Sequence, residues 1–187
     1  MKVLIVPHPF KNSLSAEAAG RAIKEGILAY DSHAQVEMIP MADGGDGSLN
    51  LLLEPFGADL MTSAVSDPLG KTIDAQWGFN LETRTAIIEL AEASGIRLLK
   101  SNERDPFKAH TFGTGELINK ALAKGAQTIY LTVGGSATLD GGFGILKALG
   151  TDFLDKSGYA VAVHQLADLR LVAALNFDRL RRNLHQV

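Results

Sequence analysis

Residues whose types and spacing could do chemistry gather in three glycine-rich segments of this sequence. The segments are Ala42-Asp-Gly-Gly-Asp-Gly-Ser48, Phe112-Gly-Thr-Gly115 and Leu131-Thr-Val-Gly-Gly-Ser-Ala-Thr-Leu-Asp-Gly-Gly-Phe-Gly144. Clustered glycine marks a tight turn or backbone that lies against a ligand. In an open α/β sheet such loops meet at the carboxyl ends of the strands, where free amides and helix dipoles favour anions. One loop could be only a turn, but three that share a sheet edge favour an anion-binding site.

Aspartates within these segments make phosphate chemistry the more specific hypothesis. A carboxylate beside an anion is unfavourable unless it holds magnesium, accepts a proton or binds a substrate hydroxyl. Asp43, Asp46 and Asp140 could do this, although Asp43 and Asp46 could equally cap turns or the following helix. Lys11, just past the first expected strand, could meet a phosphate or carboxylate, or could be a solvated surface lysine.

Other motifs for nucleotides, metals and acyl transfer are missing from the sequence. Val65-Ser-Asp-Pro-Leu-Gly-Lys-Thr72 ends like a P-loop, but Val65 replaces the first glycine and a strand pattern follows. The 5 histidines have no zinc-like spacing, there is no cysteine, and no Gly-x-Ser-x-Gly elbow occurs. If this protein handles phosphate, it does so without a Walker loop.

Composition limits the class of protein. The 187 residues are 46% hydrophobic and 21% charged, which is ordinary for a folded chain. A formal charge of −3 and the lack of a basic stripe argue against nucleic acid as a partner. The apolar runs are far shorter than the ~20 residues that span a bilayer, so we expect no membrane partner. The sequence predicts a cytoplasmic, globular protein.

Strand and helix patterns alternate around the glycine-rich segments. Apolar runs predict strands at 2–6, 35–39 and 128–133. Helical patterns follow at 15–30, 48–53 and 116–123, and a further helix after the last glycine-rich segment is expected to end at about 149. Three further strand patterns lie at hairpin spacing between 58 and 90. We expect an α/β fold: a parallel-sheet Rossmann-like lobe of residues 1–56 and 110–150, a β-rich inserted segment over 57–109, and a divergent tail over 151–187.

The glycine-rich segments also carry a family resemblance. Pro40-Met-Ala-Asp-Gly-Gly-Asp-Gly47, Phe112-Gly-Thr-Gly-Glu-Leu-Ile118 and Gly134-Gly-Ser-Ala-Thr-Leu-Asp-Gly-Gly142 resemble signature segments of bacterial glycerate kinases of the non-P-loop, two-lobe class. Phe10-Lys11, Ser13-Leu-Ser-Ala16, Asp67-Pro-Leu-Gly70 and Ala91-Glu-Ala-Ser-Gly95 match in the same order. The resemblance runs from residue 1 to about 158, and the ordered motifs make it specific.

The resemblance implies an enzyme that transfers the γ-phosphoryl of ATP, with Mg²⁺, to D-glycerate, with 2-phosphoglycerate the favoured product. It implies that Asp140 and Asp43 face a cleft between two lobes, either one as magnesium ligand or as acceptor of the glycerate hydroxyl proton. Lys11 would neutralise phosphate or the glycerate carboxylate. The expected substrate- and phosphate-binding residues are Gly44, Gly45, Asp46, Gly113, Thr114, Gly115, Gly134, Gly135 and Ser136.

Departures from the family pattern keep a second hypothesis open. His8-Pro9 stand where the family usually has Asp-Ser, Asn12 replaces a glycine, and Leu139 replaces an asparagine. Family members are also roughly twice as long, so the chain resembles their amino-terminal half. The alternative is a non-catalytic anion- or nucleotide-binding module, or an inactive fragment.

The tail predicts a further property. Leu166, Leu169, Val172 and Ala173 fit one face of a helix, which would either pack on the domain or lie exposed. If that face is exposed, we expect the chain to self-associate through it.

Overall fold

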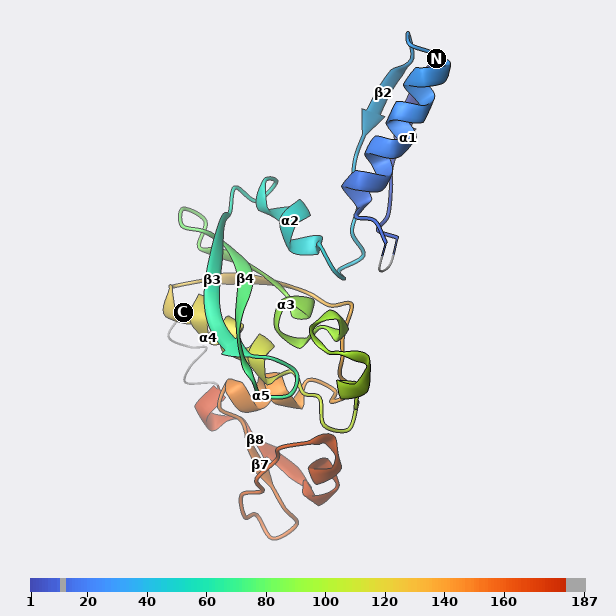
Figure 1. The fold of residues 1–187 in the computed structure, drawn as a ribbon. Coiled ribbons are helices and arrows are strands. Elements are labelled where there is room, and N and C mark those ends of the chain that lie inside the picture. The colour runs from blue at the N-terminus through green and yellow to red at the C-terminus, as the bar shows by residue number, and fades with distance from the viewer. Residues whose placement is uncertain (11–12, 181–187) are drawn as a thin grey trace.

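The computed structural model describes residues 1–10 and 13–180 as three hydrogen-bonded sheets with their helices. A central sheet lies between a projecting N-terminal unit and a small C-terminal unit (Figure 1). This arrangement confirms the expected mixed α/β class. No helix in the described part of the chain combines the length and apolar character that a bilayer crossing requires.

The central sheet is mixed. It contains β3 (Asp59–Ser66), β4 (Thr72–Asn80), β5 (Thr85–Glu89) and β6 (Thr128–Thr132), in the order β3-β4-β5-β6. The first three strands pair antiparallel, and β5 and β6 pair parallel. The expected turn between β3 and β4 forms because the Asp67 carboxylate accepts hydrogen bonds from the Leu69 and Lys71 amides, both at 2.8 Å.

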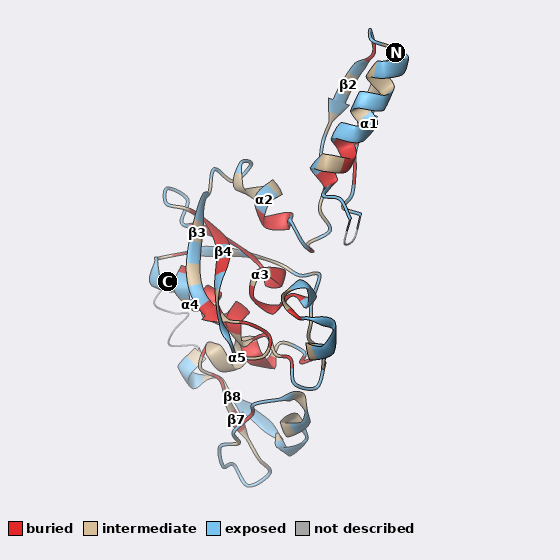
Figure 2. Cartoon of the chain, viewed as in Figure 1, coloured by how far each residue is buried: buried red, intermediate tan, exposed pale blue. Residues whose placement is uncertain are grey.

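Helices cover both faces of this sheet. The core between α4 (Phe112–Ala123) and the sheet contains Trp77, Ile88 and Leu117, all buried. Figure 2 shows buried residues along β4 and α4. Side chains alternate along a strand, so Ile87 points to the opposite face, where α2 (Ser48–Leu53) packs. Two shorter helices, α3 (Leu90–Ser94) and α5 (Phe143–Ala148), flank α4.

The N-terminal unit is a separate β-α-β element. β1 (Lys2–Ile5) and β2 (Gln35–Met38) pair parallel, and α1 (Ala16–Tyr30) connects them. Ser15 caps α1 by accepting a hydrogen bond from the Ala18 amide at 3.1 Å. After β2 the chain enters the 42–47 loop and then α2, which packs on the central sheet.

The sheets group the chain differently from the division expected from the sequence. β5, from the 57–109 segment, pairs with β6, from the 110–150 segment, while β1 and β2 pair with each other. The predicted Rossmann-like lobe would group residues 1–56 with 110–150. The sheets do not support this grouping, because β6 pairs with β5 and with neither β1 nor β2, so it stays a prediction. The physical reason is local: the crossover through α3 and α4 returns the chain beside β5, the strand it had just left.

The tail forms a small unit of its own. β7 (Asp152–Leu154) and β8 (Ala174–Asn176) pair antiparallel, with a 3₁₀ helix, η3 (Leu166–Leu171), between them. Leu169 and Val172 pack against the buried cluster of Phe143, Phe153 and Val163. Because these apolar residues pack inward and residues 151–180 contain no apolar α-helix, the structure gives no support to self-association through this segment.

The first turn of α4 depends on glycine for its close approach to other backbone. A Cβ atom at Gly113 would lie 1.8 Å from the Ser66 carbonyl oxygen, and one at Gly115 would lie 2.6 Å from Cβ of Ala148. Both positions are buried. The two glycines thus allow α4 to lie against the end of β3 and against α5.

Gly113→Ala should lower the free energy of unfolding by about 1–3 kcal/mol, because the backbone oxygen it meets cannot move independently. Gly26→Ala in α1 is the matched control, since an added Cβ there meets no atom within 4 Å. It should stabilise the chain by about 0.5–1 kcal/mol through helix propensity. Urea unfolding followed by circular dichroism measures both, and wild-type stability in Gly113→Ala would contradict the close packing.

Candidate functional site

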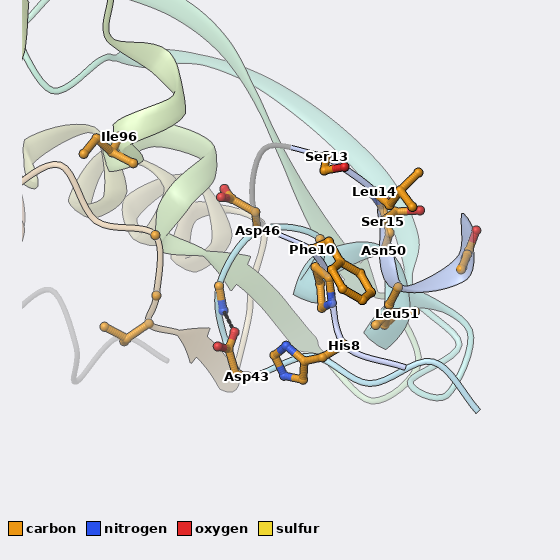
Figure 3. A pocket seen from close by; sticks show the side chains of 18 residues that line it. His8, Phe10, Ser13, Leu14, Ser15, Asp43, Asp46, Asn50, Leu51 and Ile96 are labelled. Atoms are coloured by element: carbon orange, nitrogen blue, oxygen red, sulfur yellow. Dashed lines mark hydrogen bonds between the residues drawn. The ribbon is translucent and has the colours of Figure 1, made fainter. Parts of the chain in front are cut away.

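A cavity of about 670 Å³ lies where the N-terminal unit meets the central sheet (Figure 3). Its walls come from the loop between β1 and α1, from the 42–47 loop with the start of α2, and from the segment after β6. The lining residues are His8, Pro9, Phe10, Ser13, Leu14, Ser15, Ala16, Glu17, Asp43, Gly45, Asp46, Gly47, Asn50, Leu51, Ile96, Val133, Gly134 and Gly135. Two of the three glycine-rich segments therefore share one pocket.

These two segments meet backbone to backbone. A Cβ atom at Gly134 would lie 2.6 Å from both Cα and N of Gly45, closer than real Cβ atoms approach any neighbour. Gly44 has φ +91° and lies against the backbone of Val133. Glycine is thus required at the point where the loops touch, and the contact holds the two walls together.

Asp43 and Asp46 both line the pocket, as Figure 3 shows. An Asp43 carboxylate oxygen accepts a hydrogen bond from the Gly45 amide at 3.0 Å, which closes a turn. Asp46 accepts one from Nε of Arg97, also at 3.0 Å. Arg97 also pairs with Glu92, so its charge is shared between two carboxylates at the rim of the site.

Asp140 does not line this pocket. It is 3% exposed, and its carboxylate accepts hydrogen bonds from the Thr111 amide and hydroxyl (both 2.8 Å) and from the amides of Gly142 (3.0 Å) and Gly144 (3.2 Å). These donors lie just before α4 and at the start of α5. The structure therefore does not show the cleft-facing carboxylate that the resemblance implied. Asp140 instead joins the beginnings of two helices.

Other expected residues also lie away from the pocket. Gly113, Thr114 and Gly115 are buried in the first turn of α4, where the Thr114 hydroxyl is 2.7 Å from the Ser94 hydroxyl. They are therefore not presented as an open anion loop. Ser136 is exposed just past the lining segment, and its hydroxyl accepts a hydrogen bond from the Thr138 amide. Lys11 lies outside the described residues.

Glu89 is a buried carboxylate that the sequence reasoning missed. It ends β5, is 1% exposed, and accepts hydrogen bonds from the amides of Gly47 (3.3 Å) and Leu49 (2.9 Å) at the start of α2. Burial raises the pKa of Glu89, and the nearby Glu92 adds to this, while the two amides and Arg97 oppose it. The available signal was a carboxylate directly after the apolar run Ala86-Ile-Ile88.

The raised pKa of Glu89 has a defined consequence for stability. The folded protein holds the proton more tightly than the unfolded chain does. Between the usual pKa of a glutamate and the raised one, the folded state therefore binds more protons, and ionisation of Glu89 lowers the free energy of unfolding as pH rises. The same carboxylate anchors the 47–49 backbone through its two hydrogen bonds.

Amides in the two walls differ in their availability to an anion. Those of Gly45 and Gly47 donate to Asp43 and Glu89. Those of Gly134 and Gly135 donate to no atom in the described part of the chain, although both residues line the pocket. The Gly134 and Gly135 amides on the wall that follows β6 are thus available as backbone donors to an anionic oxygen in this pocket.

Comparison with known proteins places this pocket in context. The sequence model of the glycerate kinase family matches residues 3–187. The chain belongs to the glycerate kinase family. It is 41% identical over 174 residues to a glycerate kinase of Bacillus subtilis (strain 168), a match that covers 90% of this chain. It is 40% identical over 158 residues, or 84% of the chain, to a glycerate 2-kinase of Escherichia coli (strain K12).

The fold agrees with this family. A crystal structure named for glycerate kinase 2 from Salmonella typhimurium LT2 superposes with a TM-score of 0.72 at 36% identity and covers 95% of this chain. The chain spans about half the length of the relatives it matches: 46% of the Bacillus subtilis protein, 42% of the Escherichia coli protein and 47% of the Salmonella chain.

Asp140→Asn should lower the free energy of unfolding by about 1–3 kcal/mol, because an amide group would face buried N–H and O–H donors that need an acceptor. Asp43→Asn is the matched control. An asparagine oxygen can still accept from the Gly45 amide at this exposed site, so its change should stay within about 0.5 kcal/mol. Thermal unfolding of both variants measures the difference, and equal stability of Asp140→Asn and wild type would contradict the structural role.

Proposed function

We propose that this chain forms part of an enzyme that transfers the γ-phosphoryl of ATP to D-glycerate, giving 2-phosphoglycerate. Family membership supports the reaction class. The observation that carries the proposal is the pocket in which two family signature segments meet the loop before α1. We place the enzyme in the cytoplasm, where ATP is available and where a chain without cysteine needs no oxidising compartment.

Phosphoryl transfer needs mainly positioning and charge stabilisation. We assign Asp43 to the glycerate hydroxyl, whose proton it would accept, because it is an exposed carboxylate on the pocket wall. The amides of Gly134 and Gly135 would hold anionic oxygens. Lys11 would neutralise the glycerate carboxylate or a phosphate, since Phe10 and Ser13 on either side of residues 11–12 line the same pocket.

The donor set of the pocket fits magnesium bound together with a nucleotide. Within residues 1–10 and 13–180, no group of three or more side chains forms a complete metal cage. Mg²⁺ commonly uses one or two carboxylates together with substrate phosphates and water, so Asp46 would hold it and leave Asp43 for the glycerate hydroxyl. Bound there, it would neutralise charge on the transferring phosphoryl group. Asp140 is the weaker candidate because four donors already engage its carboxylate.

The remaining signature residues would act by holding the walls in place. Asp140 joins the beginnings of α4 and α5, and the buried turn of Gly113, Thr114 and Gly115 packs α4 against its neighbours. Ser136 follows the lining glycines directly and would hold the segment through its contact with Thr138. We propose that these residues affect catalysis through positioning.

A non-catalytic anion- or nucleotide-binding module is the second candidate. The observation that favours it is that His8 and Pro9, which depart from the family pattern, both line the pocket. A changed wall could keep binding and lose turnover. The two functions differ in whether product forms.

A chimera tests the proposed reaction: the Bacillus subtilis glycerate kinase with its matched segment replaced by this chain. A coupled assay should show ATP-dependent phosphorylation of D-glycerate. Asp43→Asn in the chimera should lower kcat by ~10²-fold or more if the carboxylate takes part in proton transfer. Asp59→Asn on β3 is the control, being an exposed aspartate outside the pocket, and should leave kcat unchanged.

Near-normal kcat in Asp43→Asn would contradict its assignment. A folded chimera that binds ATP in calorimetry but forms no product would favour the binding module. The isolated chain should turn over slowly compared with the chimera, because fixing two substrates in place can be worth ~7–11 kcal/mol of barrier.

A further inference from the structure

Arg97 belongs to a short segment that contacts two walls of the pocket. It lies on the 3₁₀ helix η1 (Ile96–Leu98), and its Nε donates to an Asp46 carboxylate oxygen at 3.0 Å. The backbone of the same helix reaches the wall that follows β6, because the Ile96 amide donates to the Gly135 carbonyl at 2.8 Å. In Figure 3 the Asp46 carboxylate points toward the side of the pocket where Ile96 lies.

The side chains that line the pocket are rich in negative charge. Glu17, Asp43 and Asp46 are among them, whereas the lining residues that the structure describes include neither lysine nor arginine. Like charges repel, so a ligand that carries phosphate groups needs a positive charge close to these carboxylates.

The repulsion is most direct at Asp46. A Cβ atom at Gly135 would lie 3.3 Å from both carboxylate oxygens of Asp46, so this carboxylate lies against the glycine. The amides of Gly134 and Gly135 are the backbone donors that remain available to an anion in the pocket. An anionic oxygen held by these amides would therefore lie near the Asp46 carboxylate, and a cation must offset the repulsion.

Arg97 has the position and the chemistry to offset this charge. A guanidinium stays protonated and matches the geometry of both carboxylate and phosphate. The Arg97 side chain is 42% exposed, and its Nη2 pairs with Glu92 on α3 while its Nε pairs with Asp46. The charge of Arg97 also extends to Glu89: burial raises the pKa of that carboxyl, and Arg97 opposes the rise.

We infer that Arg97 is the counter-charge that allows a polyphosphate group to bind at the Gly134 and Gly135 amides beside Asp46. The inference deepens the proposed function and rests on it, because it takes the pocket to receive the phosphates of a nucleotide. It concerns binding alone and does not require turnover. Glu92 limits the effect, because it shares the guanidinium with Asp46.

Calorimetric titration of the 187-residue chain with inorganic tripolyphosphate tests the inference without a base, a sugar or magnesium. Arg97→Gln should weaken binding by roughly tenfold or more, because unit charges near a protein surface attract each other strongly. Arg97→Lys should keep most of the affinity, because lysine retains the positive charge although it lacks the planar fork.

Glu92→Gln should shift the affinity in the opposite direction. It removes a carboxylate that competes for Arg97, so tripolyphosphate should bind roughly threefold more tightly or better. Glu92 also accepts a hydrogen bond from the Gln76 amide at 3.2 Å, and a glutamine oxygen can accept the same bond. Local loss of structure would weaken binding, so tighter binding identifies an effect of charge.

Arg170→Gln is the matched control for the change in net charge. Arg170 is an exposed arginine on η3 in the C-terminal unit and does not line the pocket. Its substitution should leave tripolyphosphate affinity at the wild-type value. Circular dichroism verifies that each variant is folded. If Arg97→Gln does not fold, Arg97→Lys and Glu92→Gln decide the question.

Several results would overturn the inference. They are no binding of tripolyphosphate by the wild-type chain, equal weakening by Arg97→Gln and Arg170→Gln, equal weakening by Arg97→Gln and Arg97→Lys, or unchanged or weaker binding by Glu92→Gln.

Failure of the inference is distinct from failure of the proposed reaction. A chimera that forms product, together with unchanged tripolyphosphate affinity in Arg97→Gln, would overturn the role of Arg97 alone. The expected shifts in affinity, together with a folded chimera that forms no product, would support the role of Arg97 and overturn the reaction.

Discussion

The backbone contact between Gly45 and Gly134 is the constraint on which the candidate site depends. The 42–47 loop follows the N-terminal unit, and the 133–135 segment follows the last strand of the central sheet. An added Cβ at Gly134 would meet the Gly45 backbone at 2.6 Å, so any side chain there must separate the two loops. The pocket has Asp43 and Asp46 on one side of this contact. On the other side are the Gly134 and Gly135 amides, which donate to no atom among the described residues.

Two buried carboxylates stabilise the elements around that contact. Glu89 binds amides at the start of α2, and Asp140 binds donors before α4 and at the start of α5. Each carboxylate occupies a helix beginning where an anionic ligand could otherwise bind. The glycine-rich segments of this chain therefore contain both structural and pocket-lining backbone, and the hydrogen bonds distinguish the two.

Much of the fold could be predicted from local patterns. The helix after Ser15, the Asp67 turn and the apolar strands all formed where sequence periodicity placed them. The partner of each strand could not be predicted, because pairing of β5 with β6 depends on how α3 and α4 return the chain. Burial likewise depends on how distant segments pack. The sequence therefore marked Asp140 and Gly113 as candidate site residues but could not predict that both are buried. The role of Glu89 depends on a contact with Leu49, 40 residues away, that no local pattern specifies.

The central claim is that the contact between the two loops forms a functional pocket. The most direct measurement is kcat/KM for D-glycerate phosphorylation by the Bacillus subtilis chimera carrying Gly134→Ala, with Gly26→Ala as control. Displacement of a wall by about 1 Å can cost ~10²-fold in rate, so we predict a loss of that order in a protein that remains folded. Gly26→Ala should match the unsubstituted chimera. A folded Gly134→Ala chimera with unchanged kcat/KM would contradict the account.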